Sequence, residues 1–137
     1  MAPRFISISQ ADWHSMLEHV LACTPEEACG LLGGLGDQVR LVLPISNQDR
    51  SPMRYRMDPQ EQVGAMLHIE DLGYEILGIY HSHPLGPGEP SEADTKEVTY
   101  PEAAYLIWSP LEGVWRCRAF DLSSEPVREI PISVLSD

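Results

Sequence analysis

The chain has 137 residues, of which 43% are hydrophobic, and a formal net charge of −12. This length predicts a single domain over residues 1–137 that can bury a core. The acidic balance excludes nucleic acid as a partner, because a phosphate backbone would be repelled. No apolar run approaches a membrane span, and the start of the chain lacks the apolar core of a signal peptide. Three cysteines without a C-x-x-C pair fit a reducing compartment, so we expect a cytoplasmic protein.

The pattern of the first part of the chain predicts one strand, a helix and then two antiparallel strands. In chain order we expect a strand at 4–8, a helix at 10–23 capped by Ser9, and antiparallel strands from 27 to about 34 and at 39–45. His14 and His19 lie on the helix at 10–23 and are expected to face solvent or to lie at the edge of its exposed face, rather than to be ligands. Cys29 stands beside a Gly-Leu-Leu run and is expected in the core.

A second helix is expected after a polar loop and a short strand at 53–57. Asp58 followed by Pro59 is typical of a helix start, because proline fits the first helical position. His68 is expected on the exposed face of this helix. Its predicted buried stripe consists of Val63, Met66, Leu67 and Leu72.

The second half predicts a further series of strands. They are expected at 75–83, 103–108, 114–122 and, more weakly, 126–134, with a short helix at 91–98 and a turn at 109–113. This order predicts an α+β fold, with a mixed, curved sheet and helices packed against it.

The stretch at 77–97 carries the strongest chemical signal. His81 and His83 end an apolar strand, and alternation places both imidazoles on one face. A loop stiffened by proline follows, and it can bring Asp94 beside them. Two imidazoles and a carboxylate leave a fourth tetrahedral position for water, which is the layout of a catalytic zinc site. The spacing predicts one zinc ion per chain.

A structural explanation competes at two of these positions. Ser91 is a good helix N-cap, and Asp94 stands at the N3 position of a capping box. Capping accounts for Ser91 and Asp94 without a metal, but it does not explain His81 and His83.

These residues resemble the JAMM motif of the MPN+ metalloproteases, written E…H-[ST]-H-x7-S-x2-D. His81-Ser82-His83, seven residues, Ser91 and Asp94 match each written position of its second part. Glu27, three residues before Gly30 in the run Gly-Leu-Leu-Gly, matches the upstream glutamate, whereas Glu26 does not. The resemblance extends from about residue 5 to 122. It implies an MPN/JAB-like, cytidine-deaminase-like fold.

The resemblance also implies roles for these residues. His81, His83 and Asp94 would hold zinc, Glu27 would be the general base for a metal-activated water, and Ser91 would donate to the oxyanion. The substrate would be a bond after the C-terminal Gly-Gly of a ubiquitin-like or sulfur-carrier protein. The compact chain is similar to free-standing prokaryotic members.

Three other functions are weighed against this one. A non-haem iron oxygenase uses two histidines and a carboxylate, but in a different sequence order. An inactive MPN scaffold would be expected to lack active-site residues that this chain retains. A general zinc peptidase without ubiquitin-like specificity would share the whole site. The sequence leaves the physiological substrate and the oligomeric state open, including a homodimer.

A local basic cluster stands out on this acidic chain. Arg50, Arg54 and Arg56 lie within seven residues. They could hold an acidic patch of a carrier protein or only offset nearby negative charge. We expect a Gly-Gly tail to lie extended beside the strand that carries His81 and His83, with main-chain hydrogen bonds.

Overall fold

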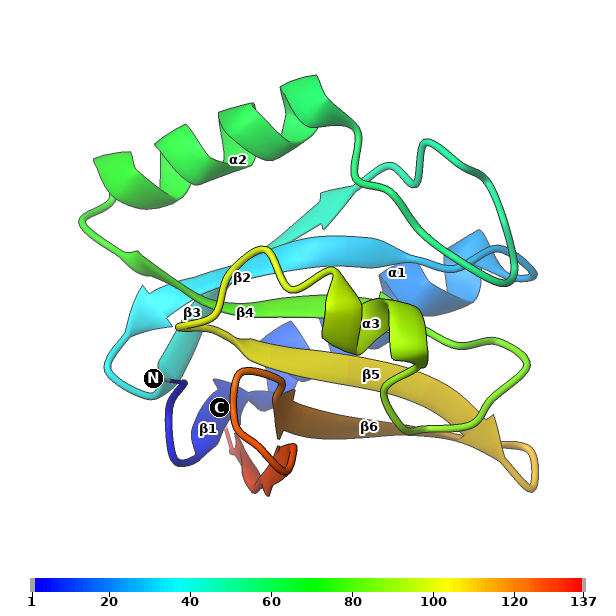
Figure 1. Ribbon diagram of the computed structural model, residues 1–137. Coiled ribbons are helices and arrows are strands. Elements are labelled where there is room, and N and C mark those ends of the chain that lie inside the picture. The colour runs from blue at the N-terminus through cyan, green and yellow to red at the C-terminus, as the bar shows by residue number, and fades with distance from the viewer. Residues whose placement is uncertain (1, 137) are drawn as a thin grey trace.

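The computed structural model describes residues 2–136 and is built on one eight-stranded sheet (Figure 1). Its elements, in chain order, are β1 (Ile6–Ser9), α1 (Gln10–Cys23), β2 (Cys29–Leu35), β3 (Gln38–Ile45), α2 (Pro59–Asp71), β4 (Glu75–Ser82), α3 (Glu92–Lys96), β5 (Ala104–Leu111), β6 (Val114–Asp121), β7 (Arg128–Ile130) and β8 (Ile132–Leu135). The predicted α+β class is confirmed. Among residues 2–136, no helix is both long and apolar enough to cross a membrane.

The sheet has the strand order β7-β6-β5-β4-β2-β3-β1-β8. It is mixed, because β1 pairs in parallel with β3 and β8, and β4 pairs in parallel with β5, while the other pairs are antiparallel. Its two edge strands, β7 and β8, are separated in the chain by Pro131 alone. The sheet must therefore curl until its edges approach one another, and β4 lies at its centre with neighbours on both sides.

Helices cover both faces of the sheet (Figure 1). Met16 and Val20 of α1 belong to one buried cluster, together with Leu32 and Tyr80. Ile69 of α2 belongs to the second cluster, together with Leu31, Ile79 and Ile107. Consecutive residues of β2 and β4 therefore enter different clusters, as strand alternation requires. Ile79 belongs to the α2-side cluster, and so do Cys29 and Ile107, the two residues that pair with His81, so His81 lies on the face of the sheet that α2 covers.

Local capping chemistry sets the helix starts. Ser9 Oγ accepts a hydrogen bond from Asp12 N–H at 3.1 Å, as predicted for α1. Asp58 accepts from the N–H groups of Gln60 and Glu61 at 3.0 Å each, and Pro59 is the first residue of α2. The two predicted helix starts are confirmed, because these signals act within one turn.

Gly30 leaves room for the ring of Tyr80 between β2 and β4. It pairs with Tyr80 of β4. A Cβ at position 30 would lie 2.2 Å from the Tyr80 ring, closer than any side chain tolerates. Glycine is required here because the buried tyrosine ring crosses the backbone of β2.

Two predicted strands differ from the structure. Residues 53–57 do not form a strand, and only an isolated bridge joins Asn47 and Met57. The reason is that Asn47 binds the Arg54 C=O and the Arg56 N–H through its own side chain, which holds the segment as a loop. The predicted strand at 126–134 is two strands, because Pro131 has no N–H with which to continue a ladder.

The predicted inner face of α2 is also wrong. Its expected stripe is exposed, with Val63 at 55% and Leu67 at 56%, and Met66 and Leu72 are exposed as well. Ile69 is the buried residue of this helix, and Ala65 packs beside it. Positions 65 and 69 are one helical turn apart, so the helix is rotated relative to the prediction. His68 is exposed, as predicted.

His19 lies at the edge of the exposed face of α1, one of the two positions expected for it. It is half-buried, and its Nδ1 lies 2.7 Å from the hydroxyl of Tyr80. Its Nε2 lies 3.4 Å from Cys23 Sγ one turn further along α1. This polar contact ties α1 to the strand that carries the metal-ligand candidates, and burial lowers the pKa of His19. His14 is exposed, as predicted.

Candidate metal centre

The end of β4 presents two imidazoles on one face. His81 pairs with Cys29 of β2 and with Ile107 of β5, so the strand is fixed from both sides. His83 follows the last residue of β4, and its N–H donates to the Trp108 C=O at 2.8 Å. His81 is fully buried and His83 nearly so. Because both neighbours hold the backbone, the two rings have little freedom to separate.

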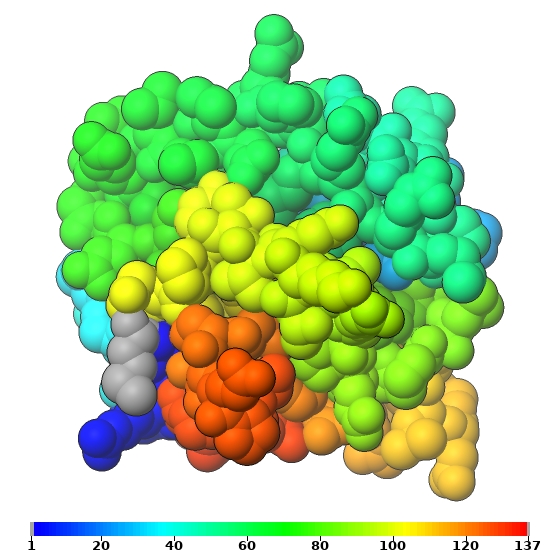
Figure 2. Space-filling model, viewed as in Figure 1, coloured from blue at the N-terminus to red at the C-terminus, as the bar shows by residue number. Residues whose placement is uncertain are grey.

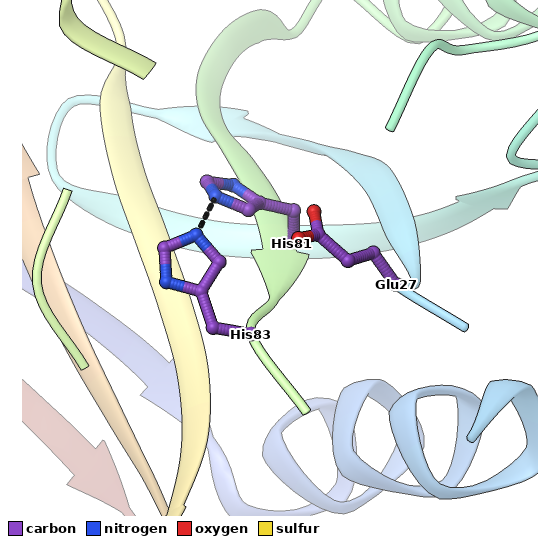
Figure 3. Close-up of side chains that lie close together, drawn as sticks. All are labelled: Glu27, His81 and His83. Carbon is purple, nitrogen blue, oxygen red and sulfur yellow. Dashed lines mark hydrogen bonds between the residues drawn. The ribbon is translucent and has the colours of Figure 1, made fainter. Parts of the chain in front are cut away.

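Three donor atoms converge at this end of the strand. His81 Nε2 lies 3.1 Å from His83 Nε2 (Figure 3). Asp94 Oδ1 lies 3.3 Å from His81 Nε2, and Asp94 Oδ2 lies 3.2 Å from His83 Nε2. The structure therefore brings together the three residues that the sequence predicts as ligands.

Asp94 reaches the histidines because α3 begins where it does. Ser91 Oγ accepts from the Asp94 N–H at 3.1 Å, and Asp94 Oδ2 accepts from the Ser91 N–H at 2.8 Å. This is a reciprocal capping box. The two explanations for Ser91 and Asp94 that the sequence left open are therefore compatible. The cap fixes the carboxylate in the position from which it contacts both imidazoles.

Glu27 lies beside the histidines, just before β2 begins. Figure 3 shows its carboxylate directed toward the imidazole of His81. Glu27, His81 and His83 each offer a ligand atom within 4.8 Å of the others. The side chain is buried, with 4% exposure. Its backbone is held by an N–H bond to Ser51 C=O at 2.8 Å and by Asn47 Nδ2, which donates to its C=O at 3.1 Å.

Ser82 ties the glutamate segment to the histidine strand. The Ala28 N–H donates to Ser82 Oγ at 2.8 Å, and the Ser82 N–H donates to the Ala28 C=O at 3.1 Å. Ser82 is fully buried between the two histidines of the sequence. Its hydroxyl takes the place of a backbone acceptor where the pairing of β2 with β4 ends, one residue after Glu27.

Two further groups orient the imidazoles, and sequence reasoning missed both. The Pro87 C=O lies 2.8 Å from His83 Nδ1, so this nitrogen carries the proton and Nε2 keeps its lone pair. The ring of Tyr55 stacks on His81 with centroids 4.6 Å apart. The proline-rich composition of the 84–90 loop signals rigidity but does not reveal which carbonyl faces His83. No sequence pattern links Tyr55 to His81.

The site separates the pKa values of its groups. Burial raises the pKa of Glu27 to about 7, with the negative charge of Asp94 adding to the shift and the charge of His83 opposing it. Burial also opposes ionisation of Asp94, but hydrogen bonds from both histidines and from Ser91 outweigh it and hold its pKa below the usual range.

The two histidines are also shifted in opposite directions. Burial lowers the pKa of His81. For His83, burial acts the same way but is outweighed by hydrogen bonds to Asp94 and Pro87, so its pKa is raised.

The donor spacing fits a tetrahedral metal ion. Zinc bonds of about 2.0–2.1 Å to nitrogen and oxygen place tetrahedral ligands about 3.3 Å apart. The three separations among His81, His83 and Asp94 are 3.1, 3.3 and 3.2 Å. The directed lone pair of His83 and the ionised carboxylate of Asp94 suit a divalent cation. These residues can hold a metal, and Glu27 stands beside it.

Comparison with known proteins places the chain in a family. Residues 9–122 match the model described as prokaryotic homologs of the JAB domain. A desampylase from Haloferax volcanii is 36% identical over 80% of this chain and 79% of its own length. A CysO-cysteine peptidase from Mycobacterium bovis is 32% identical over 96% of this chain and 92% of its own. The chain therefore belongs to the family of prokaryotic JAB-domain homologs, and the resemblance inferred from the JAMM residues is confirmed.

Solved structures share the fold. A protein from Desulfitobacterium hafniense, solved in solution, superposes with a TM-score of 0.86 at 36% identity, covering 97% of this chain and 94% of that one. A JAB1/MPN domain protein from Archaeoglobus fulgidus gives a TM-score of 0.61 at 20% identity, covering 96% of this chain and 98% of that one. The predicted MPN/JAB-like fold is confirmed.

Proposed function

We propose that this chain is a zinc-dependent peptidase or isopeptidase that hydrolyses the bond after the C-terminal Gly-Gly of a ubiquitin-like or sulfur-carrier protein. The observation that carries the proposal is the set of three donors at tetrahedral spacing with a second buried carboxylate beside them. In this proposal His81, His83 and Asp94 hold one Zn²⁺, and Glu27 remains outside the ligand set. When bound, zinc lowers the pKa of a water molecule to roughly 7.

Glu27 is the proposed general base. Its pKa of about 7 suits a group that must accept a proton and then release it near neutral pH. The water oxygen forms the new C–O bond, and the amide C–N bond breaks. Glu27 takes the water's proton and passes it to the leaving nitrogen. The products are a carboxylic acid on the carrier and a free amine.

Ser91 is the proposed donor to the oxyanion. Its Oγ uses a lone pair to accept from the Asp94 N–H, which leaves the hydroxyl proton free for donation. Ser91 and Glu27 also line the same cavity. A hydroxyl held in this way can strengthen its bond as negative charge develops on the substrate oxygen.

The substrate class is supported by the relatives' names. They include a desampylase, a CysO-cysteine peptidase and, in Thermus thermophilus, a probable TtuB-protein conjugate cleaving protease that is 40% identical over 66% of this chain and 60% of its own length. The acidic composition is consistent with a protein substrate rather than a nucleic acid.

The expected docking of the tail against β4 needs correction. β4 has β2 on one side and β5 on the other, and even His83 N–H is bonded to Trp108. A substrate strand therefore has no open edge of β4 to pair with. The tail must instead lie over the end of this strand, against the loop segments that border the site.

A tail series tests this function. Carrier proteins from the source genome would be fused to a short C-terminal peptide through Gly-Gly or through Ala-Ala, and release of the peptide followed by mass spectrometry. Glycine is expected because a narrow slot beside a metal excludes side chains. We expect cleavage of the Gly-Gly fusion, its loss on chelation with recovery on added Zn²⁺, and almost none of the Ala-Ala fusion. Equal cleavage of both would leave a general zinc peptidase.

A further inference from the structure

The loop that connects β3 to α2, residues 46–58, forms one wall of the site. Tyr55 of this loop stacks on His81, with ring centroids 4.6 Å apart and ring planes inclined by 27°. The loop lies at the surface beside α3 (Figure 2). Two cavities flank the site, and Tyr55 and Asp94 line both of them. The position of this loop therefore affects a metal-ligand candidate and the space beside it.

The side chain of Asn47 uses its whole hydrogen-bonding capacity at this wall. Its Nδ2 donates to the Glu27 C=O and to the Arg54 C=O, each at 3.1 Å. Its Oδ1 accepts from the Arg56 N–H at 3.0 Å and from the Asp49 N–H at 3.1 Å. An asparagine amide has two N–H donors and two acceptor lone pairs, so all four are matched. A reversed amide would set donors against donors, which fixes the orientation of this side chain.

Two of these bonds hold the backbone around Tyr55. Asn47 binds the C=O of the residue before Tyr55 and the N–H of the residue after it. The Gln48 N–H adds a bond to the Arg56 C=O at 2.7 Å. The backbone on both sides of Tyr55 is thereby tied to the same short stretch, so its ring is directed onto the imidazole of His81.

His81 lacks an orienting hydrogen bond of the kind that His83 has. His83 Nδ1 lies 2.8 Å from the Pro87 C=O, whereas His81 Nδ1 is buried and has no hydrogen-bond partner among residues 2–136. The second nitrogen of a metal-binding histidine normally makes such a bond, which orients the ring. At His81 the stacking contact with Tyr55 takes this orienting part.

The remaining bond donated by Asn47 reaches the residue proposed as the base. The Glu27 C=O accepts from Asn47 Nδ2, and the Glu27 N–H donates to the Ser51 C=O of the same loop at 2.8 Å. Both main-chain groups of Glu27 are therefore held by the 46–58 loop. The amide of Asn47 thus joins the segment that carries Glu27 to the segment that carries Tyr55.

We propose that Asn47 is a positioning residue for this site. Its amide sets the place of the Glu27 backbone and, through Tyr55, the orientation of His81. Among the described residues, Asn47 lines neither of the two cavities, so it acts through these neighbours. The inference rests on the proposed function for its effect on turnover, whereas its effect on the geometry of the site stands without that function.

Asn47→Asp tests this role with little change in shape. The carboxylate can still accept the two N–H bonds, but one oxygen would replace the amide nitrogen and face two carbonyl oxygens that it cannot bind. Gln48→Glu is the matched control, because it adds the same charge at the next residue, which is exposed, and leaves the amide of Asn47 in place. Tyr55→Phe keeps a ring over His81, and Tyr55→Leu removes it.

The geometry is measured first, in the metal-free protein. A stacked aromatic ring displaces the NMR signals of the protons beneath it, so the ring protons of His81 report the contact with Tyr55. The displacement should persist in Tyr55→Phe and in Gln48→Glu. It should be lost in Tyr55→Leu and should shrink in Asn47→Asp.

Zinc affinity and turnover measure the consequences. In competition with a chelator, Asn47→Asp should bind zinc about tenfold more weakly than Gln48→Glu, as for loss of a group that orients a metal ligand. It should add little further loss in a Tyr55→Leu background, because two changes that act through one contact are not additive. At saturating zinc, kcat on a Gly-Gly carrier should also fall about tenfold in Asn47→Asp, with a smaller change in KM.

Two results would overturn the inference. One is an unchanged displacement of the His81 signals in Asn47→Asp. The other is full additivity of Asn47→Asp and Tyr55→Leu in their effects on zinc affinity. Failure of the proposed function is distinguishable from both, because the wild-type protein would then bind no zinc or cleave no carrier. The His81 signals of the metal-free protein would still decide whether Asn47 positions the ring.

Discussion

Glu27 and Asp94 are two carboxylates beside the same pair of imidazoles, yet their surroundings differ. Asp94 contacts both Nε2 atoms within 3.3 Å and accepts a further bond from the Ser91 N–H at 2.8 Å. Glu27 has its backbone, not its carboxylate, held by Ser51 and Asn47. Donors lower the pKa of Asp94 below its usual range, whereas burial raises that of Glu27 to about 7.

This difference shows how two carboxylates in one site can be suited to different functions. A carboxylate that stays ionised and is satisfied by donors is suited to hold a cation. A carboxylate that is buried with few donors exchanges its proton near neutral pH and is suited to act as a base. The capping box at Ser91 creates the first environment, and the turn before β2 creates the second. Each of the following changes acts on one side of this contrast.

Glu27→Gln should have the largest effect on turnover. The amide keeps the shape of the side chain but cannot accept a proton, so kcat should fall by about 10²–10⁴-fold. Steady-state kinetics on a Gly-Gly carrier substrate measure the loss. Glu26→Gln is the control, because Glu26 is next to Glu27 in the chain but its carboxylate is not part of the site. A severe loss in Glu26→Gln with near-normal Glu27→Gln would show that the wrong glutamate was assigned.

Ser91→Ala should come next. Loss of an oxyanion donor acts mainly on the transition state, so kcat should fall by about 10²-fold with a smaller change in KM. Loss of the N-cap would by itself reduce stability by about 1 kcal/mol. Ser91→Asp, which keeps a capping acceptor but has no proton to donate, separates the two contributions. Recovery of kcat in that variant would reduce Ser91 to a helix cap.

Ser82→Ala should have a smaller effect, through the position of Glu27. The substitution leaves the buried Ala28 N–H without the acceptor that lies 2.8 Å away. We expect kcat to fall about tenfold while metal content stays unchanged, because both imidazoles keep their positions at the end of β4. Ser82→Thr retains the hydroxyl and should restore kcat. Equal losses in the alanine and threonine variants would indicate a packing effect.

The raised pKa of Glu27 makes a prediction about stability in the metal-free protein. Its pKa changes from an ordinary value of 4.5 to about 7 on folding, so the folded state binds more protons in this window. Stability must then fall as pH rises from about 4.5 to 7. Glu27→Gln has no such carboxylate, so its free energy of unfolding should not fall for this reason. The difference in free energy of unfolding, variant minus wild type, should be about 1–3 kcal/mol larger at pH 8 than at pH 4. Urea unfolding of both proteins at pH 4 and at pH 8 measures this difference. The same difference at both pH values would contradict the prediction.

Features set by a few adjacent residues were predictable from the sequence. The bounds of α1, the start of α2 and the meeting of His81 with His83 depend on capping or strand alternation, both of which act locally. Asp94 was also placed correctly, because its distance from the histidines is limited by a stiff loop.

Features that depend on partners distant in the chain were not predictable. The buried face of α2 is decided by how the helix sits on the sheet, which turns Ile69 inward instead of Leu67. The contact of His19 with Tyr80 joins residues 61 positions apart. Ser82 and Tyr55 belong to the same class, because the groups they support come close only after folding.

The metal content of two variants tests the division of roles most directly. Glu27→Gln and Asp94→Asn would be purified in parallel with the wild-type protein, and zinc measured by elemental analysis after removal of loosely bound metal. Asp94→Asn should lose the metal, because a neutral amide replaces the ionised ligand. Glu27→Gln should retain about one zinc per chain, as the wild-type protein does. Full zinc in Asp94→Asn together with its loss in Glu27→Gln would make Glu27 the third ligand and contradict this assignment.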